Sequence, residues 1–187
     1  MKLSHITASV VAALALGFAA SSAFAADGTL TFNGQVVAST CSINAGGAGG
    51  PNATITLPQV QASALSTAGQ VAGTSQPISI VLGAAGQAGC TNGDIFAINL
   101  EPSAATVDYT TGALLNTAVG GASNVQVQLM NNDFSVINAA TNAGAENQQV
   151  TIAGNTGTLT YYAQYLATGA ATAGAVDASV EYSIVQL

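Results

Sequence analysis

Short runs of alternating apolar and polar residues extend over most of the chain. In the first of them, residues 29–36, the apolar side chains and one glycine share a face, which carries Leu30, Phe32, Gly34 and Val36. Thr, Asn and Gln side chains occupy the other face. A period of two residues predicts a β-strand with one face made for burial.

Similar runs follow, separated by turn residues. We expect strands at residues 37–43, 53–57, 77–82, 95–100, 125–130, 150–153, 157–167 and 176–187. Many short strands with frequent turns and no helical pattern predict a single-domain β-sandwich of immunoglobulin-like type. A small β-barrel is the alternative.

The segments between these runs are rich in Gly, Asn and Ala. Residues 44–52 contain four glycines and a proline, which predicts a loop, and residues 139–149 also have the composition of a loop. Residues 60–70 lack an apolar stripe, so we expect a short turn or loop there. A small extra strand is possible around residues 113–116.

The first 25 residues have the pattern of a secretory signal. Lys2 and His5 precede an apolar stretch at residues 6–16, and Ala-Phe-Ala at residues 23–25 provides the small residues of a cleavage site. The apolar run ends before the roughly 20 residues that a membrane-spanning helix needs. We therefore expect residues 1–25 to be removed during export.

Cleavage would leave a chain without basic side chains. The one Lys and the one His lie in residues 1–25, and the sequence has no Arg, whereas all eight acidic residues lie further on. Binding of nucleic acid requires a basic surface, so the composition excludes it. Attraction to an anionic membrane surface is excluded for the same reason.

Cys41 and Cys90 are the two cysteines of the chain. In an exported protein, a pair of cysteines is expected to form a disulfide. Such a disulfide would close the chain between Cys41 and Cys90 into a loop, for which the chain-entropy model gives about 4 kcal/mol of stabilisation.

Catalysis has little support in the sequence. Without His or Lys in the mature chain, schemes with a Ser–His pair or a catalytic Lys have no base. A zinc site would need His or free Cys ligands, and no loop around Asp94 or Asp133 has the ligand spacing of a calcium site. We expect no catalytic residue, no metal and no cofactor.

The ends of the chain resemble a known family. Residues 27–37 combine Phe32-x-Gly34 with the downstream Cys41, and residues 162–174 end in a glycine that stands fourteen residues from the C-terminus, counting both ends. With the strand at residues 125–129, these features resemble the chaperone–usher pilins, and among them the type 1 fimbrial subunits. Pilins usually carry an aromatic residue next to last, where this chain has Gln186.

The resemblance implies an incomplete immunoglobulin-like sandwich, the pilin fold, at residues 38–187, with a donor-strand extension at residues 26–37. The family's groove, left by a missing strand, receives first a periplasmic chaperone and then the donor strand of the next subunit. Leu30, Phe32, Gly34 and Val36 would be the face that enters the groove, with Gly34 either passing a narrow point or marking a bulge. The groove and the chaperone site would involve Gly174, Val180, Tyr182, Ile184, Gln186 and Leu187.

The resemblance also implies the partners and the location. These are other pilin subunits, a periplasmic chaperone and an outer-membrane usher, with export to a fimbria at the cell surface. A major shaft subunit is favoured, and a minor adaptor subunit is the alternative. A self-contained secreted sandwich that binds a glycan or a protein is a further alternative, with Tyr109, Tyr161, Tyr162 and Tyr165 as a possible stacking surface. Tyr162 should face away from Tyr161 and Tyr165, because side chains alternate along a strand.

Overall fold

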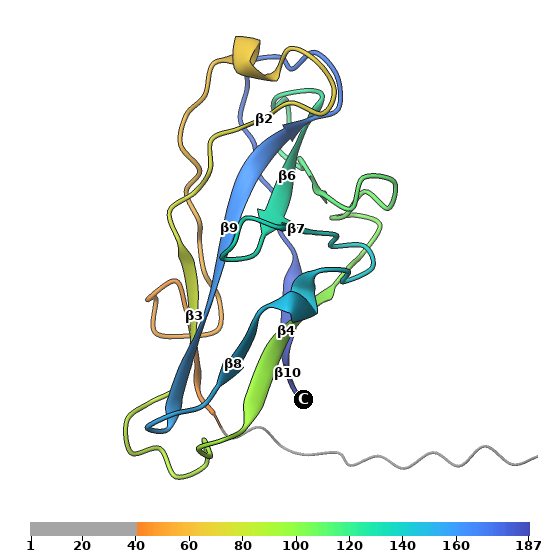
Figure 1. Ribbon diagram of the computed structural model, residues 1–187. Helices are drawn as coiled ribbons and strands as arrows, with labels where there is room; N and C mark the ends of the chain where they lie inside the picture. The colour runs from red at the N-terminus through yellow and green to blue at the C-terminus, as the bar shows by residue number, and fades with distance from the viewer. Residues whose placement is uncertain (1–40) are drawn as a thin grey trace, which may run out of the picture. The chain divides into compact units, whose positions relative to one another are not determined.

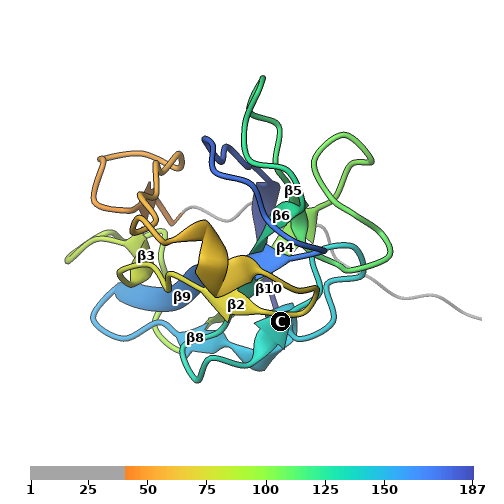
Figure 2. The ribbon, with the colours of Figure 1, turned by 90° about the horizontal axis from the view of Figure 1, so that it is seen from above.

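Two antiparallel β-sheets make up the part of the chain that the computed structural model describes, residues 41–187 (Figures 1 and 2). The larger sheet has the order β1 (Ile43–Ala45), β3 (Ile78–Gly83), β9 (Thr156–Ala167), β6 (Val125–Met130) and β5 (Leu114–Leu115). Two short strands extend it, with β2 (Val71–Ala72) on β9 and β7 (Val136–Ile137) on β6. The smaller sheet has the order β10 (Glu181–Gln186), β4 (Ile95–Glu101) and β8 (Gln149–Thr151).

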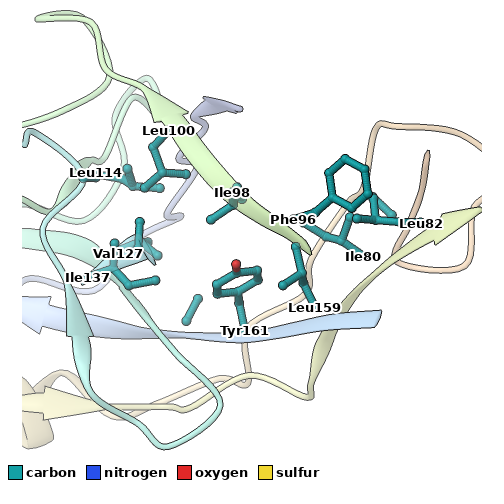
Figure 3. Packing of buried hydrophobic residues seen from close by; sticks show 14 of the residues in the cluster. Ile80, Leu82, Phe96, Ile98, Leu100, Leu114, Val127, Ile137, Leu159 and Tyr161 are labelled. Atoms are coloured by element: carbon teal, nitrogen blue, oxygen red, sulfur yellow. The ribbon is translucent and has the colours of Figure 1, made fainter. Parts of the chain in front are cut away.

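The two sheets face each other across one apolar core. Leu159 and Tyr161 of β9 point toward Phe96 and Ile98 of β4 (Figure 3), and these side chains are buried. Tyr162 lies on the outer face of the sheet and stacks on Phe134, with ring centroids 4.7 Å apart. The predicted sandwich and the alternation of the tyrosines along β9 are confirmed.

Two 3₁₀ turns interrupt the loops. The first, η1 (Ala62–Leu65), lies in the segment for which the sequence predicts a turn, and it buries Leu65. The second, η2 (Ala145–Asn147), lies in the predicted loop at residues 139–149. Within residues 41–187, no helix is long and apolar enough to cross a membrane.

The predicted strand at residues 53–57 is wrong, because this segment forms no ladder with any strand of the described chain. The prediction for residues 176–187 holds only in part, since strand pairing begins at Glu181. The alternation of apolar and polar residues in residues 53–57 correctly predicted that one face of the segment is partly buried. A β-ladder, however, also needs a neighbouring strand to which the segment can hydrogen-bond. The loop predicted at residues 44–52 begins later, because Asn44 and Ala45 pair with β3.

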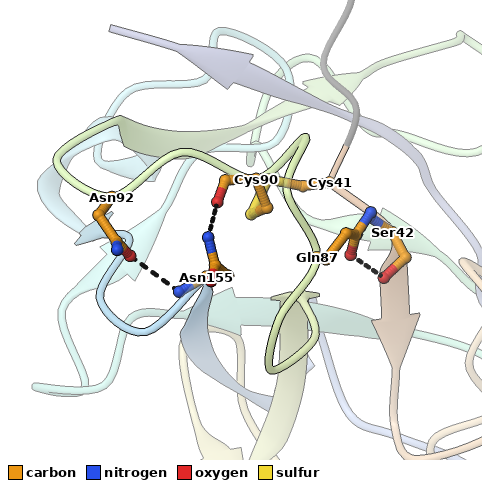
Figure 4. The surroundings of a disulfide bond; sticks show 6 residues. All are labelled: Cys41, Ser42, Gln87, Cys90, Asn92 and Asn155. Atoms are coloured by element: carbon orange, nitrogen blue, oxygen red, sulfur yellow. Dashed lines mark hydrogen bonds between the residues drawn. A yellow bond between two sulfur atoms is a disulfide. The ribbon is translucent and has the colours of Figure 1, made fainter.

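The predicted disulfide between Cys41 and Cys90 is present (Figure 4). Asn155 reinforces the surrounding loops, because its side chain donates to the Cys90 carbonyl at 2.8 Å and its backbone N–H donates to Asn92 Oδ1 at 2.8 Å. Gly83 lies directly against this site with φ = 73°. A Cβ at this position would lie 2.6 Å from the sulfur of Cys90, so the packing requires glycine.

Candidate functional site

An apolar groove opens between two segments that belong to neither sheet, residues 51–57 and 176–180, and continues to Tyr182 of β10. Its cavity volume is about 980 Å³. The floor is formed by inward-facing side chains of the larger sheet and β4, among them Ile78, Leu114, Val127, Leu129, Ile98 and Tyr161. The groove is therefore a gap in the hydrophobic core that reaches the surface.

The first wall of the groove is residues 51–57. Ile55 and Leu57 are partly buried, whereas their neighbours in this wall are exposed. Within the described chain, the backbone N–H and C=O groups of residues 52–57 have no hydrogen-bond partner. The wall therefore combines an apolar face with a free backbone edge.

The second wall is residues 176–180. Val176, Ala178 and Val180 pack against the core and line the groove. The backbone groups of Asp177 are bonded on the side away from the groove, to the loop between β5 and β6. Those of Val176 and of residues 178–180 have no partner among residues 41–187.

Tyr182 links β10, which directly follows the second wall, to the first wall, because its hydroxyl donates a hydrogen bond to the carbonyl oxygen of Pro51. Partial burial raises the pKa of Tyr182 and of Tyr165, which also lines the groove. No acidic, His or Cys cluster suited to a metal ion is found in the described residues. Hydrophobic contact and backbone hydrogen bonding are thus the chemistry that the groove offers.

Tyr161 is the polar exception on the floor. The residue is 4% exposed, and no hydrogen bond of ordinary length and angle reaches its hydroxyl within the described chain, although the backbone of Ile98 lies close by. In Figure 3 this hydroxyl points toward Ile98 on the opposite sheet. Burial raises the pKa of the phenol, so it stays neutral over the physiological range.

The predicted site residues at the C-terminus have different surroundings. Val180 and Tyr182 line the groove, while Ile184 packs against the core beside it. Gln186 is exposed and lies opposite Phe96 in the β10–β4 ladder. Leu187 is 59% exposed, and its N–H donates to the Ile95 carbonyl at 2.9 Å.

Gly174 lies where the chain enters the second wall. A Cβ there would lie 2.4 Å from the backbone nitrogen of Ala122, so the chain at Gly174 and the loop between β5 and β6 approach too closely for a side chain.

The predicted donor residues Leu30, Phe32, Gly34 and Val36 lie outside the described residues. The sequence analysis did not identify residues 51–57 as a wall of the groove, although the alternation of Ile55 and Leu57 indicates a segment with one apolar face. It also did not identify Asn116, which bonds to the second wall, because no local sequence pattern points to this residue.

Comparison with known proteins identifies the family. The family model of Type-1 fimbrial protein, A, matches residues 57–186. The F17 fimbrial protein of Escherichia coli is 44% identical over 172 residues, covering 90% of this chain and 93% of the relative. The major fimbrial subunit SMF-1 of Stenotrophomonas maltophilia is 44% identical over 167 residues, covering 86% and 93%.

A solved chaperone–usher pilus, described for the molecular basis of its rod uncoiling, has the same fold. Its subunit superposes with a TM-score of 0.52 at 22% identity, covering 87% of this chain and 96% of that one. The two-sheet sandwich, the disulfide and the sequence matches lead to one conclusion. The chain belongs to the type-1 fimbrial protein family.

Proposed function

We propose that this chain is the major shaft subunit of a fimbria and that it polymerises by donor-strand exchange. Residues 26–37 of one copy fill the groove of the next, with Leu30, Phe32, Gly34 and Val36 facing its floor. The observation that carries the proposal is an apolar groove whose two walls both have free backbone edges. A strand placed between them would complete the core and satisfy both edges.

The expected energetics suit a durable fibre. Burial of Leu30, Phe32 and Val36 contributes roughly 1.5–3 kcal/mol for each side chain. Each backbone hydrogen bond to the walls adds about 1 kcal/mol net. Because the described walls and floor contain mainly uncharged residues, the interaction is expected to persist at high salt.

The open groove also supports the need for a periplasmic chaperone and an outer-membrane usher. A subunit with exposed apolar floor and unpaired edges is prone to aggregate before it meets its neighbour. The signal at residues 1–25 supports transit through the periplasm to a fimbria outside the cell. The match to a major fimbrial subunit, at 44% identity, favours the shaft over a minor adaptor position.

Deletion of residues 26–37 tests the proposal. The shortened subunit should retain a groove that accepts a strand but donate none, so each copy ends a growing fibre. Polymers that resist dissociation in SDS, resolved by gel electrophoresis without heating, should disappear. Polymers of normal length from the deleted chain would refute donation by this segment.

A matched pair of substitutions tests which face of the segment enters the groove. Phe32→Asp should abolish polymerisation, because it would bury an unpaired carboxylate. Asn33→Asp adds the same charge on the opposite face and should leave polymers at the wild-type level. Equal loss in both variants would contradict the assigned face and indicate a general effect of negative charge.

A further inference from the structure

We propose that Asn116 is a positioning residue for strand insertion, because its side-chain amide holds the second wall so that the wall's free edge faces the groove. This inference rests on the proposed function. Asn116 follows β5 and begins the loop that leads to β6. It belongs neither to the groove lining nor to the core clusters.

The amide of Asn116 makes two bonds to the second wall and its entry. Its Oδ1 accepts from the backbone N–H of Asp177 at 2.9 Å, and its Nδ2 donates to the carbonyl of Ala175 at 3.1 Å. A residue in a parallel strand opposite Val176 would make the same pair of bonds. The side chain thus replaces one residue of a neighbouring strand.

Two further bonds fix the amide itself. Its Oδ1 accepts from the N–H of Ala118 at 3.1 Å, and its Nδ2 donates to the carbonyl of Ala122 at 2.8 Å. Both partners lie in the β5–β6 loop. The orientation of the amide is therefore determined by its own loop, and it imposes that orientation on the second wall.

This arrangement determines which edge of the wall remains free. In an extended segment the backbone groups of successive residues point to opposite sides, so bonding Ala175 and Asp177 to Asn116 directs those of Val176 and Ala178 the other way. Those groups have no partner within the described chain, and both residues line the groove. Thr117 supports the same alignment, because its N–H donates to the Asp177 carbonyl at 2.8 Å.

The close packing of Gly174 and Gly121 brings the two segments within reach of the amide. A Cβ on Gly121 would lie 2.4 Å from the carbonyl oxygen of Ala175, the same atom to which Asn116 donates. Glycine at both positions permits the approach, and Asn116 then sets the register of the wall. A side chain without both a donor and an acceptor cannot do this.

Capture of a labelled synthetic peptide with the sequence of residues 26–37 provides the test. The mature chain is diluted from denaturant into excess peptide, and the rate of peptide capture is measured by fluorescence anisotropy. Asn116→Ala should slow capture about tenfold, as expected for the loss of side-chain hydrogen bonds that align the wall. Ser123→Ala is the matched control, because it removes the 3.0 Å hydroxyl contact with Thr172 between the same two segments, away from the groove. Its capture rate should equal that of the wild type.

Asn116→Asp separates positioning from general destabilisation. At neutral pH its carboxylate keeps the acceptor role but has no proton to donate to the carbonyls of Ala122 and Ala175. Protonation near pH 4 restores one donor, so the capture rate relative to wild type should recover as the pH falls. Asp177 is the one titratable side chain in residues 114–125 and 171–178, the described segments packed around Asn116. The same measurement with Asp177→Asn in both proteins shows whether the recovery comes from position 116 alone.

The outcomes distinguish this inference from the proposed function. If the wild type captures no peptide, donor-strand exchange is refuted and the role of Asn116 with it. If the wild type captures peptide but Asn116→Ala does so equally fast, or the ratio for Asn116→Asp does not change with pH, the positioning role is overturned. Because the Asp variant is compared with the wild type at each pH value, an effect of pH on folding that both proteins share does not obscure the result.

Discussion

The two ends of the same core differ in how completely they are closed. At the disulfide end, Leu82, Cys90 and Leu159 are 0% exposed, and Phe96 is 2% exposed. At the groove end, Ile78, Leu129 and Val180 pack against the same core but stay partly exposed. Both ends carry apolar side chains in the same alternating pattern. The difference is the open groove, which a single strand would close under the proposed function.

The largest expected loss of stability comes from removing the disulfide at the closed end. Replacing both Cys41 and Cys90 by Ala should lower the free energy of unfolding by about 4 kcal/mol, since the disulfide restricts the unfolded chain across a sequence separation of 49 residues. Urea unfolding of the mature chain measures the loss. Unchanged stability would mean that the other contacts of this end, such as those of Asn155, are sufficient.

A core truncation at the closed end comes next. Leu82→Ala should cost roughly 3 kcal/mol, because Leu82 is fully enclosed and its removal leaves a cavity that the sheets cannot fill. The midpoint of urea unfolding reports this change at constant slope. A loss below about 1 kcal/mol would show that this end rearranges easily.

Leu129→Ala makes the same truncation at the groove. The loss should be only roughly 1 kcal/mol in the subunit with an open groove, because Leu129 already lies against an open space. In the polymer the loss should approach that of Leu82→Ala, since an inserted strand would enclose the side chain. Equal losses in subunit and polymer would contradict filling of the groove on assembly.

The smallest expected effect is the loss of stability at acidic pH that arises from Asp108. The backbone N–H of Thr110 and the side chain of Gln126 hydrogen-bond to Asp108 and hold the pKa of its carboxyl below the ordinary value of 3.8. A depressed pKa stabilises the folded state above pH 3.8, and this contribution is lost as the pH falls through the lower folded-state pKa. Because Asp108 is largely solvated, the loss should stay below about 1 kcal/mol. Urea midpoints of wild type and Asp108→Asn, compared at pH 5 and near pH 3, should differ less at the lower value.

The local sequence pattern was sufficient to predict the structure where buried and outward-facing positions alternate along a strand. The alternation in β9 predicted that Tyr161 and Tyr162 lie on opposite faces of the sheet, and the strands β4 and β6 lie where the pattern places them. The disulfide followed from the count of cysteines and the expected compartment. These inferences need only the period of the pattern and the chemistry of single residues.

The pattern failed where the outcome depends on distant partners. Residues 53–57 alternate like a strand, but hydrogen bonds from a neighbour decide whether a strand forms. The two-residue strands β2 and β7 are too short to show a period. Asn116 reaches residues about 60 positions away, and in sequence it is one Asn among many.

The free backbone edges beside the groove make the stability of this fold depend on concentration. Any strand that binds only the folded chain adds RT ln(1 + [L]/Kd) to the free energy of unfolding, so a thousandfold excess over Kd adds about 4 kcal/mol. Under the proposed function, a dilute subunit and a subunit inside a fibre have the same sequence and the same described contacts, yet different melting temperatures. A melting temperature would then be a property of the assembly as well as of the sequence.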